Sequence, residues 1–180
     1  MNDAAFQFTE GKPFFPMVMS FLAATIGLGP LFDPSQPPPV PLKQVAWYVG
    51  RLQPTVGIDM AQVRQGCLAG VITADAAVKS LCGMLLNSAY AVAEPHNDRS
   101  PEFEFFRHVR NAVSHGNRFY FAAQEPRRAA AWSGLVIDRA RMGKRNPLFG
   151  VECVGQTLSP ADALALLRVI EDRLPWRQGA

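Results

Sequence analysis

Apolar positions along most of this chain recur every three or four residues, a pattern that predicts a mainly helical protein. The first helix is expected from Pro16 to Leu28, a tract apolar nearly all round and therefore deeply buried. The proline-rich segment Asp33 to Pro41 predicts an extended connector. A short helix is expected from Leu42 to Arg51, and helical spacing then continues from Asp59 to Glu94.

Two features within the segment Asp59 to Glu94 bear on its packing. Thr73, followed by Asp75, either caps a second helix and divides the segment, or lies on an exposed face. Helix–helix packing is the expected reason for three glycines, which let a neighbouring helix approach closely: Gly66, Gly70 and Gly83.

A further helix, later in the chain, has capping signals at both of its ends. Ser100 is a favoured N-cap, Pro101 takes the first helical position, and Gly116 matches a C-terminal cap. The helix is therefore predicted to run from about Pro101 to His115. A last helix begins in the same way, with Ser159 as its cap, and buries an apolar stripe of Leu164, Leu167 and Ile170.

Between these two helices the pattern changes to short runs rich in β-formers. The runs are RFYFAA, AAWSGLVID and FGVECVG, and they predict a small antiparallel sheet of two or three strands. The predicted fold class is mainly α: a helical bundle with a small C-terminal antiparallel β element and a closing helix. We expect one domain in three parts. Residues 1–41 hold the N-terminal helix and connector, 42–121 the helical core, and 122–180 the β element and last helix.

Composition and charge narrow the class of protein. Of the 180 residues, 48% are hydrophobic and 18% charged, which describes a folded globular chain. The net charge of +3 comes mostly from arginine and mildly favours a phosphate-bearing partner, but it is too small to argue for a large nucleic-acid footprint. Cys67, Cys82 and Cys153 lie far apart without metal-binding spacing, so we expect reduced, buried thiols in a cytoplasmic protein with no metal or cofactor.

The uncharged tract Phe14 to Phe32 approaches membrane-spanning length and has two interpretations. One is a single membrane anchor. The other is a buried helix interrupted by Pro16, Gly27, Gly29 and Pro30, which leave too short a helix to span. The second interpretation is favoured, so no membrane contact is expected.

On a helical wheel, the Pro101–His115 helix separates into an apolar arc and an opposite polar arc. The polar arc holds Glu104, Arg107, His108, Arg110, Asn111, Ser114 and His115. Arginine offers fixed charge and forked donors for phosphate, and histidine transfers protons near neutral pH. The alternative is a solvated face without chemistry.

The order Arg110-Asn111-Ala112-Val113-Ser114-His115 resembles the R-x4-H motif of the HEPN superfamily, in which a polar residue, often asparagine, follows the arginine. The resemblance covers about Leu42 to Phe121. It implies an α-helical bundle with the motif toward the end of a helix. The β-rich runs and the last helix are not accounted for by a minimal bundle of this family.

The resemblance also implies an activity and partners. Many members cut RNA without metal, as homodimers whose motif helices face each other, and leave a 2′,3′-cyclic phosphate. Carried onto this chain, His115 is the general acid or base, Arg110 binds the scissile phosphate, and Asn111 orients His115 or the phosphate. A toxin–antitoxin or phage-defence setting, with an antitoxin protein as a further partner, is implied in the same way.

Four more residues are expected to line the same cleft and bind substrate more weakly: Glu104, Arg107, His108 and Ser114. The alternative for His108 is an ordinary surface histidine, and for Glu104 an ion pair with Arg107 or His108 one turn away. The rival function is a non-catalytic HEPN-like module that holds RNA or a nucleotide. A third is a membrane-tethered effector that uses the tract Phe14 to Phe32.

Overall fold

The computed structural model describes residues 8–37, 45–48 and 56–175, and the chain divides into two compact units. One unit is built from Met1–Phe21 and Lys79–Ala180, and the other from Leu22–Val78. The predicted helical core of residues 42–121 is therefore divided between the two units rather than forming one body.

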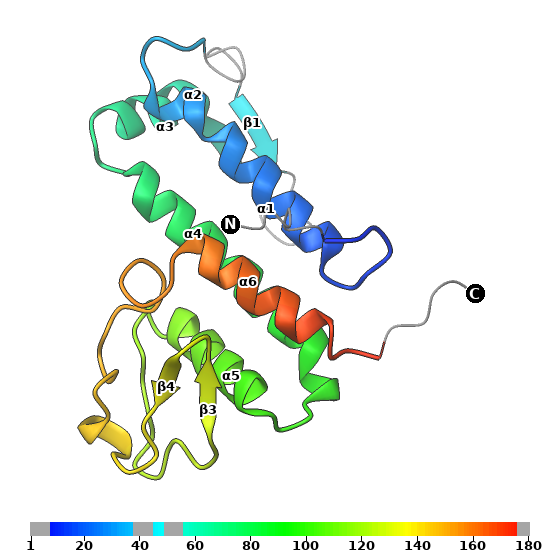
Figure 1. Ribbon diagram of the computed structural model, residues 1–180. Coiled ribbons are helices and arrows are strands. Elements are labelled where there is room, and N and C mark those ends of the chain that lie inside the picture. The colour runs from blue at the N-terminus through cyan, green and yellow to red at the C-terminus, as the bar shows by residue number, and fades with distance from the viewer. Residues whose placement is uncertain (1–7, 38–44, 49–55, 176–180) are drawn as a thin grey trace. The chain divides into compact units, whose positions relative to one another are not determined.

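The chain is mainly helical, as predicted, with small antiparallel sheets (Figure 1). The helices are α1 (Phe15–Gly27), α2 (Gly29–Phe32), α3 (Met60–Leu68), α4 (Ala74–Ala93), α5 (Pro101–Ser114) and α6 (Pro160–Glu171). Strands β1 (Val45–Tyr48) and β2 (Val56–Asp59) form one two-stranded sheet, and β3 (Ala130–Trp132) and β4 (Leu135–Ile137) form another. Short 3-10 helices occupy Glu94–His96 and Gly143–Arg145.

In the smaller unit, the prediction of a helix from Leu42 to Arg51 is wrong for the residues that the structure describes, Val45–Tyr48, which form a strand. Strand β1 pairs antiparallel with β2, with Val45 opposite Asp59 and Tyr48 opposite Val56. The sequence of β1, VAWY, is rich in β-branched and aromatic residues, which fit a pleated surface. The rest of that predicted helix lies outside the described residues.

The segment Asp59 to Glu94 is divided rather than continuously helical. The Asp59 carboxylate caps α3 by accepting from the backbone N–H of Ala61 at 2.8 Å. Gly70, with a φ of +74°, follows the end of α3, and Thr73 Oγ1 accepts from the N–H of Ala76 at 3.1 Å where α4 begins. The capping interpretation of Thr73 is therefore confirmed.

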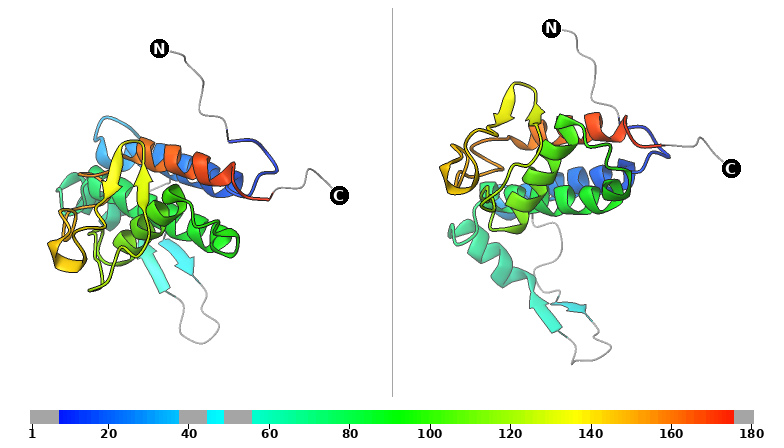
Figure 2. Two further views of the ribbon diagram at one scale, coloured as in Figure 1. Left: turned by 60° about the horizontal axis from the view of Figure 1, so that its bottom comes forward. Right: turned by 90° about the horizontal axis from the view of Figure 1, so that it is seen from below.

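In the larger unit, α5 packs against α6 and against strand β3 (Figures 1 and 2). It contributes Phe103, Phe105 and Phe106 to a core in which all three are fully buried. The ring of Tyr90 from α4 meets Phe106 edge-on at 5.4 Å between centroids. The motif helix is thus held firmly by its aromatic face.

The predicted role of glycine in helix packing is confirmed at one position. A Cβ on Gly83 of α4 would lie 3.6 Å from Cβ of Val113 on α5, so these helices pass close together there. Gly66 and Gly70 have no heavy atom of the described residues within 4 Å of such a Cβ, so the packing explanation is not confirmed for them.

The ends of α5 agree with the capping signals. Ser100 Oγ accepts from the N–H of Phe103 at 3.2 Å, and Pro101 is the first helical residue. At the other end His115 is the C-cap, and Gly116 takes a φ of +71° that reverses the chain.

Of the three β-rich runs, one forms both strands of the small sheet. The run AAWSGLVID forms a whole hairpin, β3 and β4, around Ser133 and Gly134, which both have positive φ. RFYFAA and FGVECVG contain no described strand but are joined by an isolated bridge between Arg118 and Glu152. The predicted small antiparallel β element is therefore present, as a sheet of two strands.

Helix α6 has the predicted capping box between Ser159 and Asp162, and it buries Leu167 and Ile170, with Leu164 only partly covered. Its buried Glu171 accepts from the backbone N–H of Phe14 at 2.8 Å. The prediction that the first helix is deeply buried is wrong, because α1 buries only two of its side chains, Val18 and Phe21.

Two helical stretches of the described chain, Phe15–Phe32 and Ala74–His96, are long and apolar enough to cross a membrane, judged by length and composition alone. Helix α1 ends at Gly27, as the breakers predicted, but α2 follows after the single residue Leu28. The absence of a membrane anchor and the cytoplasmic location stay predictions.

Candidate functional site

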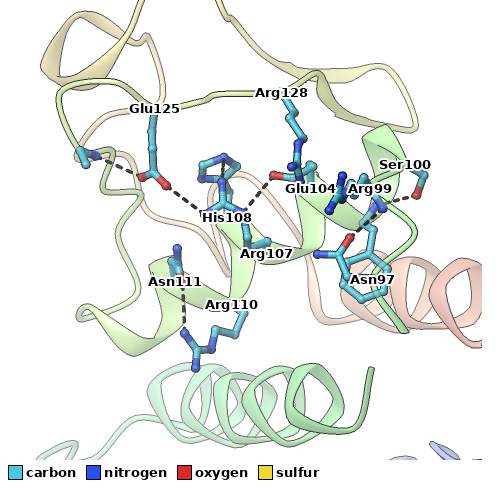
Figure 3. A network of polar contacts seen from close by, with 12 residues as sticks. Asn97, Arg99, Ser100, Glu104, Arg107, His108, Arg110, Asn111, Glu125 and Arg128 are labelled. Carbon is cyan, nitrogen blue, oxygen red and sulfur yellow. Dashed lines mark hydrogen bonds and ion pairs between the residues drawn. The ribbon is translucent and has the colours of Figure 1, made fainter. Parts of the chain in front are cut away.

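The motif arginine and asparagine lie next to each other on α5, on the side of α4 (Figure 3). Arg110 Nη1 donates to Asn111 Oδ1 at 3.1 Å. The guanidinium carbon of Arg110 also lies 5.1 Å from the ring centroid of Tyr90, a cation–π contact. Arg110 is half-buried, and both contacts restrict where its positive charge points.

The motif histidine, His115, is the C-cap residue of α5, and its side chain is exposed. Its ring centroid is 6.0 Å from that of Tyr120. His115 lines a cavity of about 390 Å³ together with Arg118, Phe119, Tyr120, Phe149 and Gly150. We call this cavity the His115 groove. It combines a titratable ring, a guanidinium and aromatic surface.

The chain after α5 builds the groove by folding back on the helix. The N–H of Arg118 donates to the carbonyl of Ala112 at 3.1 Å. The side chain of Asn117, a residue with a φ of +61°, both donates to and accepts from the backbone of Val154, at 2.8 and 2.9 Å. Arg118 Nη1 donates to the carbonyl of Gly150 at 2.7 Å. These bonds fix the groove beside the motif helix.

Arg110 is not among the residues that line the His115 groove. His115 is the C-cap residue just after α5, with a φ of −111° and a ψ of 50°, so its side chain does not continue the helical spacing of Arg110.

The other half of the polar arc forms a partly buried ionic network (Figure 3). Arg107 is at its centre, with Nε 3.0 Å from Glu104, Nη1 2.9 Å from Glu125 and Nη2 3.0 Å from Nε2 of His108. Arg128 reaches the second oxygen of Glu104 at 3.2 Å. Burial acts to lower the pKa of Arg107, but hydrogen bonds to Glu125 and Glu104 outweigh it and raise that pKa.

His108 is 1% exposed and is therefore not a surface histidine. Burial, and then the positive charge of Arg107, lower its pKa from 6.5 to about 4. Because Arg107 is always a donor, Nε2 of His108 accepts, and the neutral ring carries its proton on Nδ1. That atom has no hydrogen-bond partner among the described residues. The centroid of the His108 ring is 5.2 Å from the centroid of the Phe121 ring.

The positions of Glu104, Arg107 and His108 differ from the expectation that they line one cleft with the motif residues. The helical wheel placed Glu104 and His108 on an exposed arc, but residues 118–128 cover that arc. The ion pair of Glu104 with Arg107 is confirmed. Glu104 and Arg107 line a different cavity, of about 330 Å³, whose walls are completed by Tyr90, Glu94, Asn97, Glu125, Arg127 and Arg128. His108 lines neither cavity.

Ser114 points toward α4 rather than into the groove. Its hydroxyl donates to Oδ1 of Asn87 at 2.7 Å, a contact that joins the two helices. The cysteines are free and buried, as predicted, and burial raises the pKa of Cys82 to about 11. Within the described part of the chain, no group of three or more His, Cys, Asp or Glu side chains is placed to hold a metal ion.

Sequence reasoning missed the residues that complete both sites. Tyr120, Arg118 and Phe149 of the groove belong to runs that were assigned to strands, where aromatic residues are ordinary. Glu125 and Arg128, which close the ionic network, lie in the turn QEPRR. The signal available was the run GNRFYF directly after the motif, which places an arginine and a tyrosine one turn beyond the histidine.

Comparison with known proteins gives no relative: no family model, no curated protein and no solved structure matches this chain. The resemblance to the HEPN superfamily accordingly rests on the motif residues Arg110 to His115 and on their position at the end of a helix.

Proposed function

We propose that this chain is a metal-independent endoribonuclease of the HEPN type, with His115 as its proton-transferring residue. The observation that carries the proposal is the exposed imidazole of His115 at the end of the motif helix, in one groove with Arg118 and Tyr120. A titratable ring, a phosphate-binding group and a base-stacking surface are the parts that RNA cleavage needs.

The reaction is an internal transfer at phosphorus. The 2′-oxygen of a ribose attacks the adjacent phosphorus, the bond from phosphorus to the 5′-oxygen breaks, and a 2′,3′-cyclic phosphate forms. A base takes the proton of the 2′-hydroxyl, and an acid gives a proton to the departing 5′-oxygen. An imidazole serves in either role, and a guanidinium stabilises the charge that develops on the phosphoryl oxygens.

A homodimer supplies what one copy lacks. One chain brings a single imidazole to the His115 groove, and its Arg110 is held by Asn111 and Tyr90 outside that groove. A partner copy would place its own Arg110 and Asn111 at the scissile phosphate beside this imidazole. Cleavage is therefore expected to require self-association.

The test is cleavage of a labelled single-stranded RNA in EDTA. We expect His115→Ala and Arg110→Ala each to abolish cleavage with the fold intact by circular dichroism, and wild-type products to end in 2′,3′-cyclic phosphate. His96→Ala is the matched control, because His96 is also exposed but ends the short 3-10 helix Glu94–His96 before α5. Unchanged cleavage by the His115 and Arg110 variants contradicts the assignment.

A second candidate function is a non-catalytic module that binds RNA or a nucleotide. It is favoured by the pairing of Arg110 with Asn111 and Tyr90, which leaves this arginine half-buried. Purified protein that binds RNA with a steep salt dependence and leaves it intact would support this function. A role as a cytoplasmic toxin or phage-defence effector, with an antitoxin protein as partner, belongs to the nuclease proposal.

A further inference from the structure

We infer that the His115 groove binds an unpaired nucleobase, stacked on the ring of Tyr120, and that the substrate class is single-stranded rather than duplex RNA. The inference deepens the proposed function and rests on it for the identity of the ligand as RNA. Its own prediction concerns binding, and binding can be measured without cleavage.

Tyr120 is held outward by its neighbours in the chain. Phe119 and Phe121 are 1% and 2% exposed and stack on each other with an interplanar angle of 10°. Side chains alternate along an extended backbone, so the residue between them points the opposite way. Tyr120 is accordingly 54% exposed. The packing of two phenylalanines thus fixes an aromatic ring at the surface.

The backbone around Tyr120 is fixed as well. The N–H of Phe119 donates to the carbonyl of Val151 at 3.0 Å, and the carbonyl of Phe119 accepts from the N–H of Gly150 at 2.8 Å. The Tyr120 ring contacts the rings of His115 and Phe149, at centroid distances of 6.0 and 5.7 Å. A ring held in place loses little freedom when a base stacks on it, so most of the stacking free energy is retained.

Arg118 supplies the phosphate-binding group of the same nucleotide. It is two residues before Tyr120, and both side chains line the groove. Its Nη1 is anchored on the carbonyl of Gly150, while its other guanidinium nitrogens bond no described residue. An anchored guanidinium with free donors, next to an exposed ring, matches a phosphate next to a base.

The size and openness of the groove favour one nucleotide of a single strand. Its volume of about 390 Å³ is near the lower end of the roughly 300–1,000 Å³ typical of small-ligand sites. In an A-form duplex the faces of each base are covered by its neighbours, so a base reaches a protein ring only when it is unpaired and unstacked. Duplex RNA would offer this groove only its backbone.

The experiment uses the full-length wild-type chain and 2′-O-methyl RNA, which cannot be cleaved because its 2′-oxygen carries no proton. Fluorescence anisotropy would give the dissociation constants of a labelled single-stranded 12-mer and of the same strand in a duplex. We expect Tyr120→Ala to weaken single-strand binding about tenfold, Tyr120→Trp to preserve it, and Arg118→Ala to weaken it and reduce its salt dependence. A 2-aminopurine base in the strand should lose fluorescence on binding wild type but not Tyr120→Ala.

Val136→Ala is the control, because Val136 is also exposed and apolar but lies on β4, outside the groove. Equal affinity of wild type and Tyr120→Ala, or equal affinity for duplex and single strand, overturns the inference. If wild type does not cleave ordinary RNA but shows the expected binding, the nuclease proposal fails and the stacking site stands. If wild type cleaves ordinary RNA and Tyr120→Ala binds normally, the stacking site is contradicted and the nuclease proposal stands.

Discussion

A guanidinium nitrogen of Arg107 lies 3.0 Å from Nε2 of His108, the next residue along α5, and the imidazole has to accept this hydrogen bond. The contact holds only while His108 is neutral, because a protonated ring would present a second positive charge to Arg107. The pair belongs to the network that joins α5 to residues 118–128, so the protonation of His108 is coupled to the stability of the larger unit.

This coupling predicts a stability that falls with decreasing pH. The folded pKa of His108 is lowered to about 4, against 6.5 for an ordinary histidine, so between these values the unfolded chain binds more protons than the folded one. The contribution is fully present above about pH 6.5 and is lost as the pH falls toward 4. At about 1.4 kcal/mol per pKa unit, the loss is on the order of 3 kcal/mol.

Urea unfolding at pH 7.5 and pH 5.0 measures the effect. We expect His108→Gln, which keeps a side-chain acceptor for Arg107, to remove most of the difference between the two pH values. Glu125 of the network also lies close to His108. Burial acts to raise its pKa, but hydrogen bonds from Arg107 and Ala122 outweigh it and keep that pKa below the usual 4.5, outside the interval from pH 5.0 to pH 7.5. His96→Gln, at an exposed histidine, should keep the wild-type slope; an unchanged slope in His108→Gln would show that His108 is not the cause.

Glu104 is predicted to be the most sensitive member of the same network. It is 3% exposed and its two oxygens bind Arg107 and Arg128, so Glu104→Gln removes a buried negative charge and leaves the half-buried guanidinium of Arg107 with Glu125 alone. We expect a loss of about 2–4 kcal/mol in the free energy of unfolding at pH 7.5.

Glu94→Gln is the matched control for that change. Glu94 lines the same cavity but is exposed and has no ion pair among the described residues, so its variant should change stability by less than about 0.5 kcal/mol. Comparable losses from both variants would mean that general charge at this cavity, rather than the buried pairing of Glu104, sets the stability.

The parts of the fold that the sequence predicted well are decided by residues close together in the chain. Ser100 and Ser159 are each followed by proline and by an acidic residue in the first turn, and these local signals give both helix starts correctly. The start of α4 at Thr73 has the same kind of local cause.

What the sequence did not predict depends on segments that meet only in the folded chain. The angle of His108 on a helical wheel is correct, but nothing in that angle says that Phe121 and Glu125 cover it. Strand β1 was assigned to a helix because four residues are too few for a period to be distinguished, and its pairing with β2 decides the outcome. Likewise, the separation of Arg110 from the His115 groove appears only when the fold-back after Gly116 is known.

The need for two copies makes a prediction about mixed dimers. If each active centre combines Arg110 of one chain with His115 of its partner, a dimer of Arg110→Ala with His115→Ala has one centre with both residues and one with neither. Co-expression of the two inactive variants should then restore about a quarter of wild-type cleavage, because half of the dimers are mixed and each has one intact centre. The variants expressed separately are the controls. Co-expressed variants that form mixed dimers, verified with two different affinity tags, but do not cleave would place Arg110 and His115 of the same chain in one centre.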